Sequence, residues 1–379
     1  MLTDCYPPRL GGIESQVRDL SAQLVGAGHE VEVFTATAGA GGERGGVVTG
    51  DDGVTVHRLA LPLPAGIPVN PFARPEVRRR LAAGAFDVAH AQLGVVSPFA
   101  TDLVPVALGV GLPVTATFHC VIDRSAALFR AVGHLARWAR RGVALNAVSS
   151  MAAARVSAAA RGAAVEVVPN GVDAAWWHPA RRGPASDGSR DPGHDGRDVH
   201  VVSAMRLVAR KRPVAALAVL RGAREAVGAD VGLRATIVGE GPQRRAMERY
   251  LRTHGMDWVD LPGRVGRDEL RRLHHGADAY LTTARLEAFG IAALEARAAA
   301  VPVVALRGTG VDDFVGDGVE GLLADTDPAL ADALAHLAGD GDLRARMRAH
   351  LVSTPPAQDW PGVLAATLSE YARAGAPAA

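Results

Sequence analysis

Short runs of β-branched and apolar residues alternate along this chain with longer stretches in which apolar residues recur at helical spacing. The short runs are typical of buried strands and the longer stretches of amphipathic helices, so repeated β-α-β units with parallel sheets are predicted. The predicted strands are residues 30–35, 54–59, 87–90, 113–118, 199–203, 234–238, 279–282 and 302–306. These units are too many for one sheet, and two doubly wound α/β domains are therefore expected.

The pattern is interrupted in two places. Residues 183–196 hold, apart from prolines, a single alanine as their apolar residue, so they are expected to form a loop near the domain junction. At the other interruption, only Met1, Leu2 and Thr3 precede the turn that begins at Asp4. Either the opening strand is short, or the natural start lies upstream of Met1.

Composition narrows the class of protein. The chain has 379 residues, a formal net charge of +1 and two cysteines, Cys5 and Cys120. These values favour a cytoplasmic protein of two domains, with no disulfide framework and no demand for nucleic acid. The longest apolar stretch, residues 103–118, is broken by Pro105 and Pro113 and is too short to span a bilayer.

Lysine usage singles out one residue. The chain has 41 lysine and arginine residues, and Lys211 is the only lysine. Lys211 and Arg206 follow the strand predicted at 199–203, so both are expected at the carboxyl end of a parallel sheet. A lysine ammonium is a compact point charge, unlike the planar guanidinium, and a tight phosphate site is one place where this matters. Lys211 is either such a phosphate ligand or a solvated loop residue.

A first glycine turn precedes the helix predicted at 13–27. Gly11 and Gly12 would let backbone N–H groups approach an anion at the helix start. Glycines at such a place also serve plain tight turns, and both interpretations stay open on this motif alone.

A second glycine turn carries carboxylates. Gly290 marks the start of a helix predicted to continue through Ala300, and its first N–H groups can face a phosphate. Glu287 lies before that start, and Glu295 lies more than one turn inside the helix. The two carboxylates either accept hydrogen bonds from sugar hydroxyls or are solvated charges near a helix start.

The ordered set of motifs resembles the retaining glycosyltransferases of family 4. The resemblance rests on Arg206-x4-Lys211 and on Glu287-x7-Glu295 around a Phe-Gly turn. Further segments that agree in order are residues 11–14, 117–119, 168–173, 238–242 and 261–265. The match runs from the first residues to about Asp325; the insertion at 183–196 and the alanine at position 288 depart from it.

The resemblance implies the GT-B fold, in which two doubly wound Rossmann-like domains face each other across a cleft. Residues 1–172 would form the acceptor-side domain and residues 173–358 the domain that binds a nucleotide sugar. A C-terminal helix at about 359–374 is expected to pack back on the first domain.

The resemblance also implies roles for individual residues. Arg206 and Lys211 would hold the diphosphate, while Glu295 would hold the ribose and Glu287 the sugar. The catalytic residues expected in this way are His119, Arg206, Lys211 and Glu287. The expected donor-binding residues are Gly11, Gly12, Gly239, Arg264, Val265, Phe289, Gly290, Ile291 and Glu295.

The implied reaction moves a hexose to an acceptor hydroxyl with retention, and needs neither a metal ion nor a cofactor. GDP-mannose and the UDP-hexoses remain open as donors, and a lipid, a glycan or a small molecule as acceptor. A non-catalytic nucleotide-sugar-binding scaffold and a GT-B nucleotide-sugar epimerase are the alternatives.

Arginines without acidic neighbours mark residues 124–141 as a basic amphipathic helix. Trp138 at its edge favours contact with an anionic membrane surface, so a peripheral location at the inner face of the plasma membrane is one expectation. The other is that Leu135 and its apolar neighbours face the domain core. Cys5 and Cys120 are both expected as thiols at the carboxyl edge of the first sheet.

Overall fold

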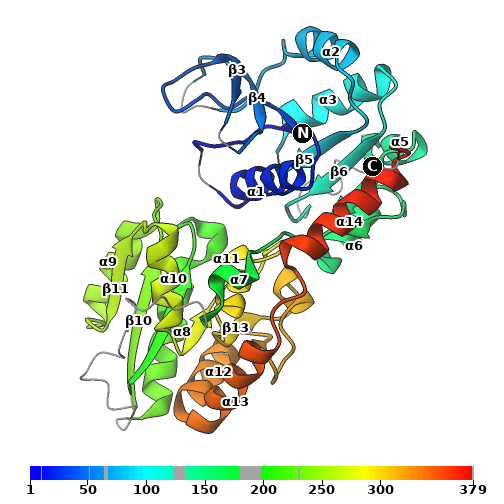
Figure 1. Cartoon of the computed structure of the whole chain (residues 1–379). Helices are drawn as coiled ribbons and strands as arrows, with labels where there is room; N and C mark the ends of the chain where they lie inside the picture. Colours follow the sequence, from blue (N-terminus) through cyan, green and yellow to red (C-terminus); the bar gives the residue numbers. More distant parts are fainter. Residues whose placement is uncertain are drawn as a thin grey trace. The chain divides into compact units, whose positions relative to one another are not determined.

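The computed structural model describes residues 1–9, 11–50, 52–63, 67–94, 96–122, 133–179, 198–228 and 231–377. The chain divides into an N-terminal unit, Met1–Gly171 with Trp360–Ala379, and a C-terminal unit, Val172–Asp359 (Figure 1). The junction loop expected at 183–196 lies outside the described residues.

Eight strands in the described residues form the sheet of the N-terminal unit. They are β1 (Leu2–Thr3), β2 (Glu32–Thr35), β3 (Gly45–Thr49), β4 (Thr55–Leu59), β5 (Ala89–Leu93), β6 (Val114–Phe118), β7 (Ala144–Ala147) and β8 (Glu166–Val167). Their order is β3-β4-β2-β1-β5-β6-β7-β8, and all neighbours are parallel except the β3–β4 hairpin. This is a doubly wound sheet whose winding reverses between β1 and β5, with a hairpin added at one edge.

The helices of this unit are α1 (Gly12–Gly26), α2 (Arg74–Ala83), α3 (Pro98–Gly109), α5 (His134–Arg140), α6 (Ser150–Ala159) and α14 (Trp360–Arg373). Helix α1 packs with α14, and α2 packs with α3. Every residue of β5 and β6 is buried, as expected for central parallel strands covered on both faces.

The C-terminal helix α14 is part of the N-terminal unit. At its start, Trp360 lies so close to Gly171 that a Cβ there would be 2.5 Å from the indole ring. Farther along, the Tyr371 hydroxyl lies 3.0 Å from Nδ1 of His90. Asn146 on β7 donates to Glu370 at 3.2 Å. Buried side-chain hydrogen bonds of this kind fix a helix in one position on a sheet, because a shift would leave polar groups unpaired.

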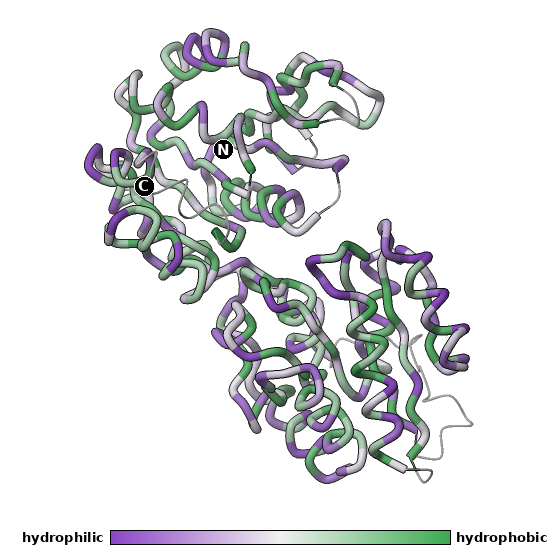
Figure 2. The backbone as a smooth tube through the Cα atoms, turned by 180° about the vertical axis from the view of Figure 1, so that it is seen from behind, coloured by the Kyte–Doolittle hydropathy of each residue, from purple (hydrophilic) through white to green (hydrophobic). Residues whose placement is uncertain are grey.

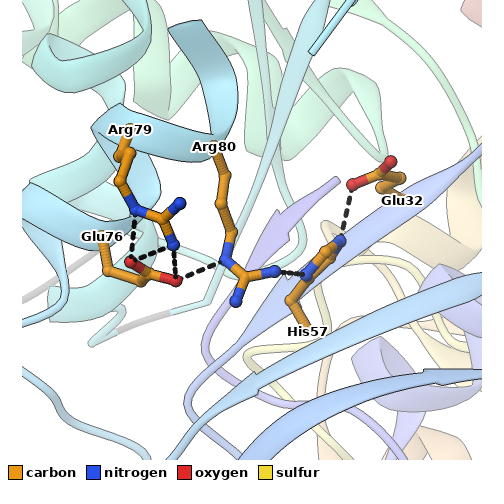
Figure 3. Close-up of polar contacts among 5 residues, drawn as sticks. All are labelled: Glu32, His57, Glu76, Arg79 and Arg80. Carbon is orange, nitrogen blue, oxygen red and sulfur yellow. Dashed lines mark hydrogen bonds and ion pairs between the residues drawn. The ribbon is translucent and has the colours of Figure 1, made fainter. Parts of the chain in front are cut away.

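Helix α2 is joined to strands β4 and β2 by a chain of polar contacts (Figure 3). His57 on β4 lies 2.5 Å from Glu32 through Nε2 and 2.7 Å from Arg80 of α2 through Nδ1. Arg80 and Arg79 both pair with Glu76. Because an arginine only donates, Nδ1 of His57 accepts and Nε2–H donates to Glu32. Burial lowers the pKa of His57, which agrees with this neutral ring.

In the C-terminal unit, six strands form a sheet in the described residues. They are β9 (Asp198–Ala204), β10 (Gly232–Val238), β11 (Val259–Gly263), β12 (Ala279–Leu281), β13 (Val303–Leu306) and β14 (Gly321–Ala324). All pair in parallel, in the order β11-β10-β9-β12-β13-β14. Counted along the chain, this is the Rossmann order 3-2-1-4-5-6.

The helices of the C-terminal unit are α7 (Ala174–Trp177), α8 (Pro213–Val227), α9 (Arg244–Thr253), α10 (Arg267–His275), α11 (Ile291–Ala298), α12 (Asp327–Gly339) and α13 (Gly341–Ser353). Helix α8 packs against α12, and their apolar faces join the strands in one core. Figure 2 shows the expected pattern: helices alternate between hydrophilic and hydrophobic residues, whereas the central strands are mainly hydrophobic.

Each strand predicted from a hydrophobic run has a counterpart, and the fold class is confirmed as two Rossmann-like α/β units. The strands that were not predicted are β3, β7, β8, β11 and β14. Strand β3 is glycine-rich and exposed at every position, so it carries no hydrophobic signal. Helix α11 ends at Ala298 and not at Ala300, because Ala300 has a left-handed backbone with φ of 59°.

One expectation about the basic helix is wrong within the described residues. Trp138 is buried with 6% exposure, and Leu135 is fully buried, because α5 turns both side chains into the core of the N-terminal unit. The edge aromatic therefore cannot enter a membrane. Arg137, Arg140 and Arg141 remain exposed, and residues 124–132 lie outside the described part of the chain.

Candidate active site

The sheet order of the C-terminal unit selects one place for a ligand. The winding of the sheet reverses between the neighbouring strands β9 and β12, and such a switch point opens a crevice at the carboxyl ends of the strands. The loop after β9 carries Arg206 and Lys211, and the loop after β12 carries Glu287. Two charged residues predicted from separate motifs thus meet at the expected ligand position.

Lys211 and Glu287 form an ion pair between Nζ and Oε2. Their side chains are 19% and 14% exposed, so water screens the pair far less than it screens a surface salt bridge. Lys211 is the last residue of a short 3-10 helix, Ala209–Lys211, that ends directly before α8. The site therefore holds a cation and a carboxylate side by side at the sheet edge.

The loop that carries Glu287 is fixed by its main chain. The Glu287 carbonyl accepts a hydrogen bond from the Gly310 N–H at 2.9 Å. A Cβ at Gly310 would lie 2.2 Å from the Ala288 carbonyl oxygen, so only glycine allows this approach. Gly290 has φ of 95° and caps the start of α11, where backbone N–H groups are available to an anion.

Tyr280 lies beneath both predicted carboxylates. It is buried on β12 and its hydroxyl donates to the Ala204 carbonyl at 3.1 Å. Burial raises the pKa of Tyr280, and the nearby charges of Glu287 and Glu295 raise it further. The second carboxylate, Glu295 on α11, is partly exposed.

Gly239 lies at the carboxyl end of β10, beside the same loops. Its N–H donates to Gly263 at 2.7 Å, and its φ is 138°. A Cβ on Gly239 would lie 1.8 Å from the Met205 carbonyl, so a side chain would push the β9 loop aside. Arg264 after β11 is exposed and Val265 is partly exposed.

Two further predicted residues contribute in different ways. Arg206 is exposed, and no hydrogen bond or ion pair of its side chain is seen among the described residues. Phe289 is buried with 2% exposure, and its ring packs against Phe314 at 5.3 Å between centroids. Only the main chain of Phe289 can therefore contact a ligand. Ile291, the first residue of α11, is partly exposed.

In the N-terminal unit, His119 follows β6 and lies between two amides. Its Nε2 is 2.6 Å from Oε1 of Gln92, and its Nδ1 is 3.1 Å from the side-chain oxygen of Asn170. Burial lowers the pKa of His119 to about 4, while the Asn170 contact raises it. A neutral ring has one N–H and can donate to only one of these two oxygens, so a neutral His119 requires the other amide to be turned with its NH₂ group toward the ring.

The first glycine turn lies beside the same strands. Gly11 has extended backbone, and Gly12 opens α1 and is exposed. Glu14 in the first turn is 7% exposed and lies 3.5 Å from Arg9. A Cβ on Gly94, after β5, would lie 3.2 Å from Ile13, so the loop after β5 is in close contact with the first turn of α1.

Asp4 directly after β1 has a structural task that the motifs did not reveal. Its carboxylate accepts hydrogen bonds from the N–H groups of Phe99 at 2.9 Å and Ala100 at 3.1 Å. It therefore caps the start of α3. Burial raises the pKa of Asp4 to about 6, and these backbone hydrogen bonds act in the opposite direction.

Four partners of the predicted site residues were missed. Gln92 and Asn170 contact His119, and Arg212, the chain neighbour of Lys211, pairs with Asp327. Only Gln92 had a visible signal, because it is a polar residue within the buried run of β5. Within the residues that the structure describes, no three His, Cys, Asp or Glu side chains gather as a metal site would require.

The cysteines agree with the expected sheet topology. Cys5 follows β1 and Cys120 follows β6, so both lie at the carboxyl edge of the N-terminal sheet. They are not joined by a disulfide. No helix in the described part of the chain is long and apolar enough to cross a membrane.

Solved structures with this architecture define the class. Anabaena HepE in complex with UDP and glucose aligns over 96% of this chain and 98% of its own, with a TM-score of 0.72 and 18% identity. WaaG, a glycosyltransferase involved in lipopolysaccharide biosynthesis, aligns over 99% and 98%, with a TM-score of 0.68 and 17% identity. The chain thus has the fold of the GT-B glycosyltransferases.

The family follows from sequence similarity. Residues 10–176 match the model of Glycosyltransferase Family 4, and residues 187–350 match that of Glycosyl transferases group 1. A D-inositol 3-phosphate glycosyltransferase of Pseudarthrobacter chlorophenolicus is 30% identical over 95% of this chain and 90% of its own. A GDP-mannose-dependent alpha-(1-6)-phosphatidylinositol monomannoside mannosyltransferase of Mycobacterium tuberculosis is 28% identical over 98% and 97%. The chain belongs to glycosyltransferase family 4, as its motifs predicted.

Proposed function

We propose that this glycosyltransferase moves a hexose from a nucleoside diphosphate sugar to an acceptor hydroxyl, with retention at the anomeric carbon and without a metal ion. The observation that supports the proposal most is the Lys211–Glu287 ion pair at the β9/β12 switch point. A largely buried cation suits an anionic diphosphate, and a neighbouring carboxylate suits the hydroxyls of a sugar.

The positive charges are assigned to the diphosphate. Lys211 and Arg206 neutralise it, and the N–H groups of Gly290 and Ile291 at the start of α11 add a partial positive charge. Lys211 stabilises the negative charge that builds on the leaving phosphate while the glycosidic bond breaks. These groups take the part that a divalent cation has in other transferases, which is why no metal ion is proposed.

The carboxylates and the remaining loops are assigned to the rest of the donor. Glu295 accepts hydrogen bonds from the ribose, and Glu287 accepts them from the transferred sugar. Gly239 and the main chain at Arg264 and Val265 face the base. These assignments use groups that lie along one sheet edge, because all strands of this unit are parallel.

His119 is proposed to hydrogen-bond the transferred sugar, and Gly11 and Gly12 to let backbone approach the donor. His119 serves as a neutral group, since its pKa is lowered to about 4. In front-side attack, the acceptor oxygen bonds to the anomeric carbon as the bond from that carbon to phosphate breaks. The acceptor proton passes to the leaving phosphate oxygen, so no protein nucleophile is required.

Relatives indicate the range of substrates. Their names state GDP-mannose as donor in one case, and inositol phosphate or phosphatidylinositol mannoside as acceptors. We therefore propose GDP-mannose or a UDP-hexose as donor and a lipid or glycan as acceptor. A cytoplasmic protein that contacts the membrane through charge fits such an acceptor, with the exposed Arg137, Arg140 and Arg141 as the contact.

A donor screen read by nucleotide release tests the proposal. Wild-type protein, K211A and the control R210A are incubated with each nucleotide sugar, with EDTA and with candidate acceptors. Arg210 is the exposed neighbour of Lys211, so R210A removes the same charge from the same loop. We expect release from one donor, EDTA-resistant, intact in R210A and lost in K211A. Nucleotide binding without any turnover would indicate the scaffold, and an epimerised sugar would indicate the epimerase.

The stereochemistry and the membrane contact have their own measurements. NMR of the product formed from an α-linked donor is expected to show an α-linkage, and a β-linkage would overturn retention. Sedimentation with anionic vesicles is expected to show salt-sensitive binding that is reduced when Arg137, Arg140 and Arg141 become glutamate. No binding at low salt would leave a soluble acceptor.

A further inference from the structure

Arg212, the residue after Lys211, has an unusual backbone. Its φ and ψ are 57° and 47°, a left-handed conformation that side-chain-bearing residues avoid. It lies at the junction of the 3-10 helix that carries Lys211 and helix α8, which begins with Pro213. The backbone direction at Arg212 therefore determines where the side chain of Lys211 points.

The side chain of Arg212 is held by two other segments. Its guanidinium pairs with both carboxylate oxygens of Asp327, the first residue of α12, with Nη1 2.9 Å from Oδ1. Nη1 also donates to the Thr283 carbonyl at 2.9 Å, and the Thr283 hydroxyl donates back to the Arg212 carbonyl at 3.1 Å. Left-handed conformations persist when surrounding contacts over-determine them, as these contacts do.

Asp327 also reaches the loop that carries Glu287. Its Oδ1 lies 3.2 Å from Nη2 of Arg285, two residues before Glu287. Thr283 at the start of that loop is already joined to Arg212. One carboxylate at the start of α12 thus connects the loop of the catalytic cation with the loop of its partner, and α12 itself is anchored by packing against α8.

We propose that Arg212 and Asp327 are positioning residues that hold Lys211 against Glu287 by keeping Arg212 in its left-handed conformation. The inference rests on the proposed function of Lys211. The consequence that distinguishes this proposal is that activity depends on the backbone conformation at position 212 and not on the charge of its side chain. Glycine adopts that conformation without strain, whereas alanine does not.

Four variants test this consequence. R212A removes the clamp and leaves a residue that avoids left-handed backbone, so kcat is expected to fall about tenfold to a hundredfold, with a smaller rise in donor KM. R212G removes the same charge but supplies the conformation, so its kcat is expected to stay within about threefold of wild type. D327N is expected to resemble R212A, and R212G in the D327N background to restore most of the loss.

R285A is the matched control. R285A removes the second arginine that pairs with Asp327. Arg285 is 55% exposed, and its own backbone is not in the left-handed region. Its activity is expected to stay within about twofold of wild type, as for other exposed pairs. Equal losses in R212A and R212G, with unchanged thermal unfolding, would overturn the proposal and assign Arg212 a direct electrostatic role.

A second readout does not depend on activity. Lys211 is the only lysine of the chain, so 13C-lysine labelling yields one lysine spin system in the NMR spectrum. Its Cε–H signal is expected to move or broaden in R212A and D327N and to keep its wild-type position in R212G. An unmoved signal in R212A would overturn the positioning role. If K211A retains full activity, the proposed function of Lys211 is wrong, even if the lysine signal moves in R212A.

Discussion

Apart from the hairpin strand β3 and the additional edge strand β8 of the N-terminal unit, the two units share one strand order. They differ in the residues that they place at the switch point. In the C-terminal unit, the loops after β9 and β12 bring together opposite charges, Lys211 and Glu287. In the N-terminal unit, the loop after β1 carries Asp4, whose carboxylate caps the start of α3 by accepting two backbone hydrogen bonds. Its nearest candidate for substrate contact, His119, is neutral and held by amides. The same fold thus provides an electrostatic site in one unit and a neutral hydrogen-bonding site in the other.

This difference agrees with the roles proposed for the two units. A diphosphate needs cations, and its leaving group gains charge during reaction, so the charged switch point suits it. A sugar and an acceptor hydroxyl are neutral, and neutral donors and acceptors suit them. Activity should therefore depend on charge in the C-terminal unit and on neutral hydrogen-bonding groups in the N-terminal unit.

The largest effect is expected at Lys211. K211A should lower kcat about a hundredfold to a thousandfold, because a preorganised cation at a leaving group contributes a few kcal/mol to lowering the barrier. K211R should also be impaired, since the planar fork does not fit a point-charge site. Steady-state kinetics of K211A and K211R, with R210A as the control, measures both effects. Wild-type turnover in K211A would show that the charge at the switch point is not needed for the reaction.

The two carboxylates of the C-terminal unit should separate kinetically. E287A should lower kcat about tenfold to a hundredfold, because Glu287 is proposed to contact the sugar ring that becomes cation-like. E295A should mainly raise donor KM, about tenfold, because the ribose does not change during reaction. The reverse pattern would mean that the two roles are exchanged.

Because the His119 ring is neutral, its ionisation should not change kcat/KM near neutral pH. Its pKa is lowered to about 4, so the ring stays uncharged from pH 6 to 8 and should add no step to kcat/KM there. Because the pKa of His119 is lower in the folded protein than its ordinary value of 6.5, the neutral ring contributes to the free energy of unfolding above pH 6.5. This contribution should be lost as the pH falls through about 4. H119A should lower kcat about tenfold through the lost hydrogen bond. A kcat/KM step near pH 6.5 that H119A abolishes would show a charged histidine instead.

Asp4 should affect stability and leave the chemistry unchanged. Its raised pKa of about 6 means that folding favours the protonated form, so this contribution is present below pH 3.8 and lost as the pH rises through about 6. Asparagine does not titrate. The free energy of unfolding of wild type should therefore fall by about 2 kcal/mol relative to that of D4N between pH 4 and pH 7. Denaturant titrations at both pH values measure this, and a constant gap would contradict the shifted pKa.

Hydrophobic runs were sufficient to predict the central strands, because buried parallel strands are apolar along their whole length. They could not predict β3, which is exposed, or β8, whose two residues are both exposed. Trp138 was placed at a membrane because a helical pattern does not say whether its apolar side meets lipid or a core. Lys211 was singled out because it is the only lysine, and Glu287 because it lies before the glycine turn at Gly290; both lie in loops after predicted strands.

The sequence motifs did not identify the residues that surround the candidate site. Asp327 lies far from Lys211 in the sequence, and only the packing of α12 beside α8 brings it to Arg212. Gln92 and Asn170 flank His119 for the same reason, since their strand and loop are neighbours only in the folded sheet. Contacts between distant segments require the sheet order, which the sequence pattern of a single chain does not contain.

The central claim is that Lys211 at the β9/β12 switch point binds the diphosphate of the donor. The most direct measurement follows the single lysine signal of 13C-labelled protein while GDP or UDP is added, with R210A as control. We expect a saturable shift of that signal in both wild type and R210A, with a midpoint at the nucleotide concentration that calorimetry gives for binding. Nucleotide binding that leaves the lysine signal unmoved would contradict this claim.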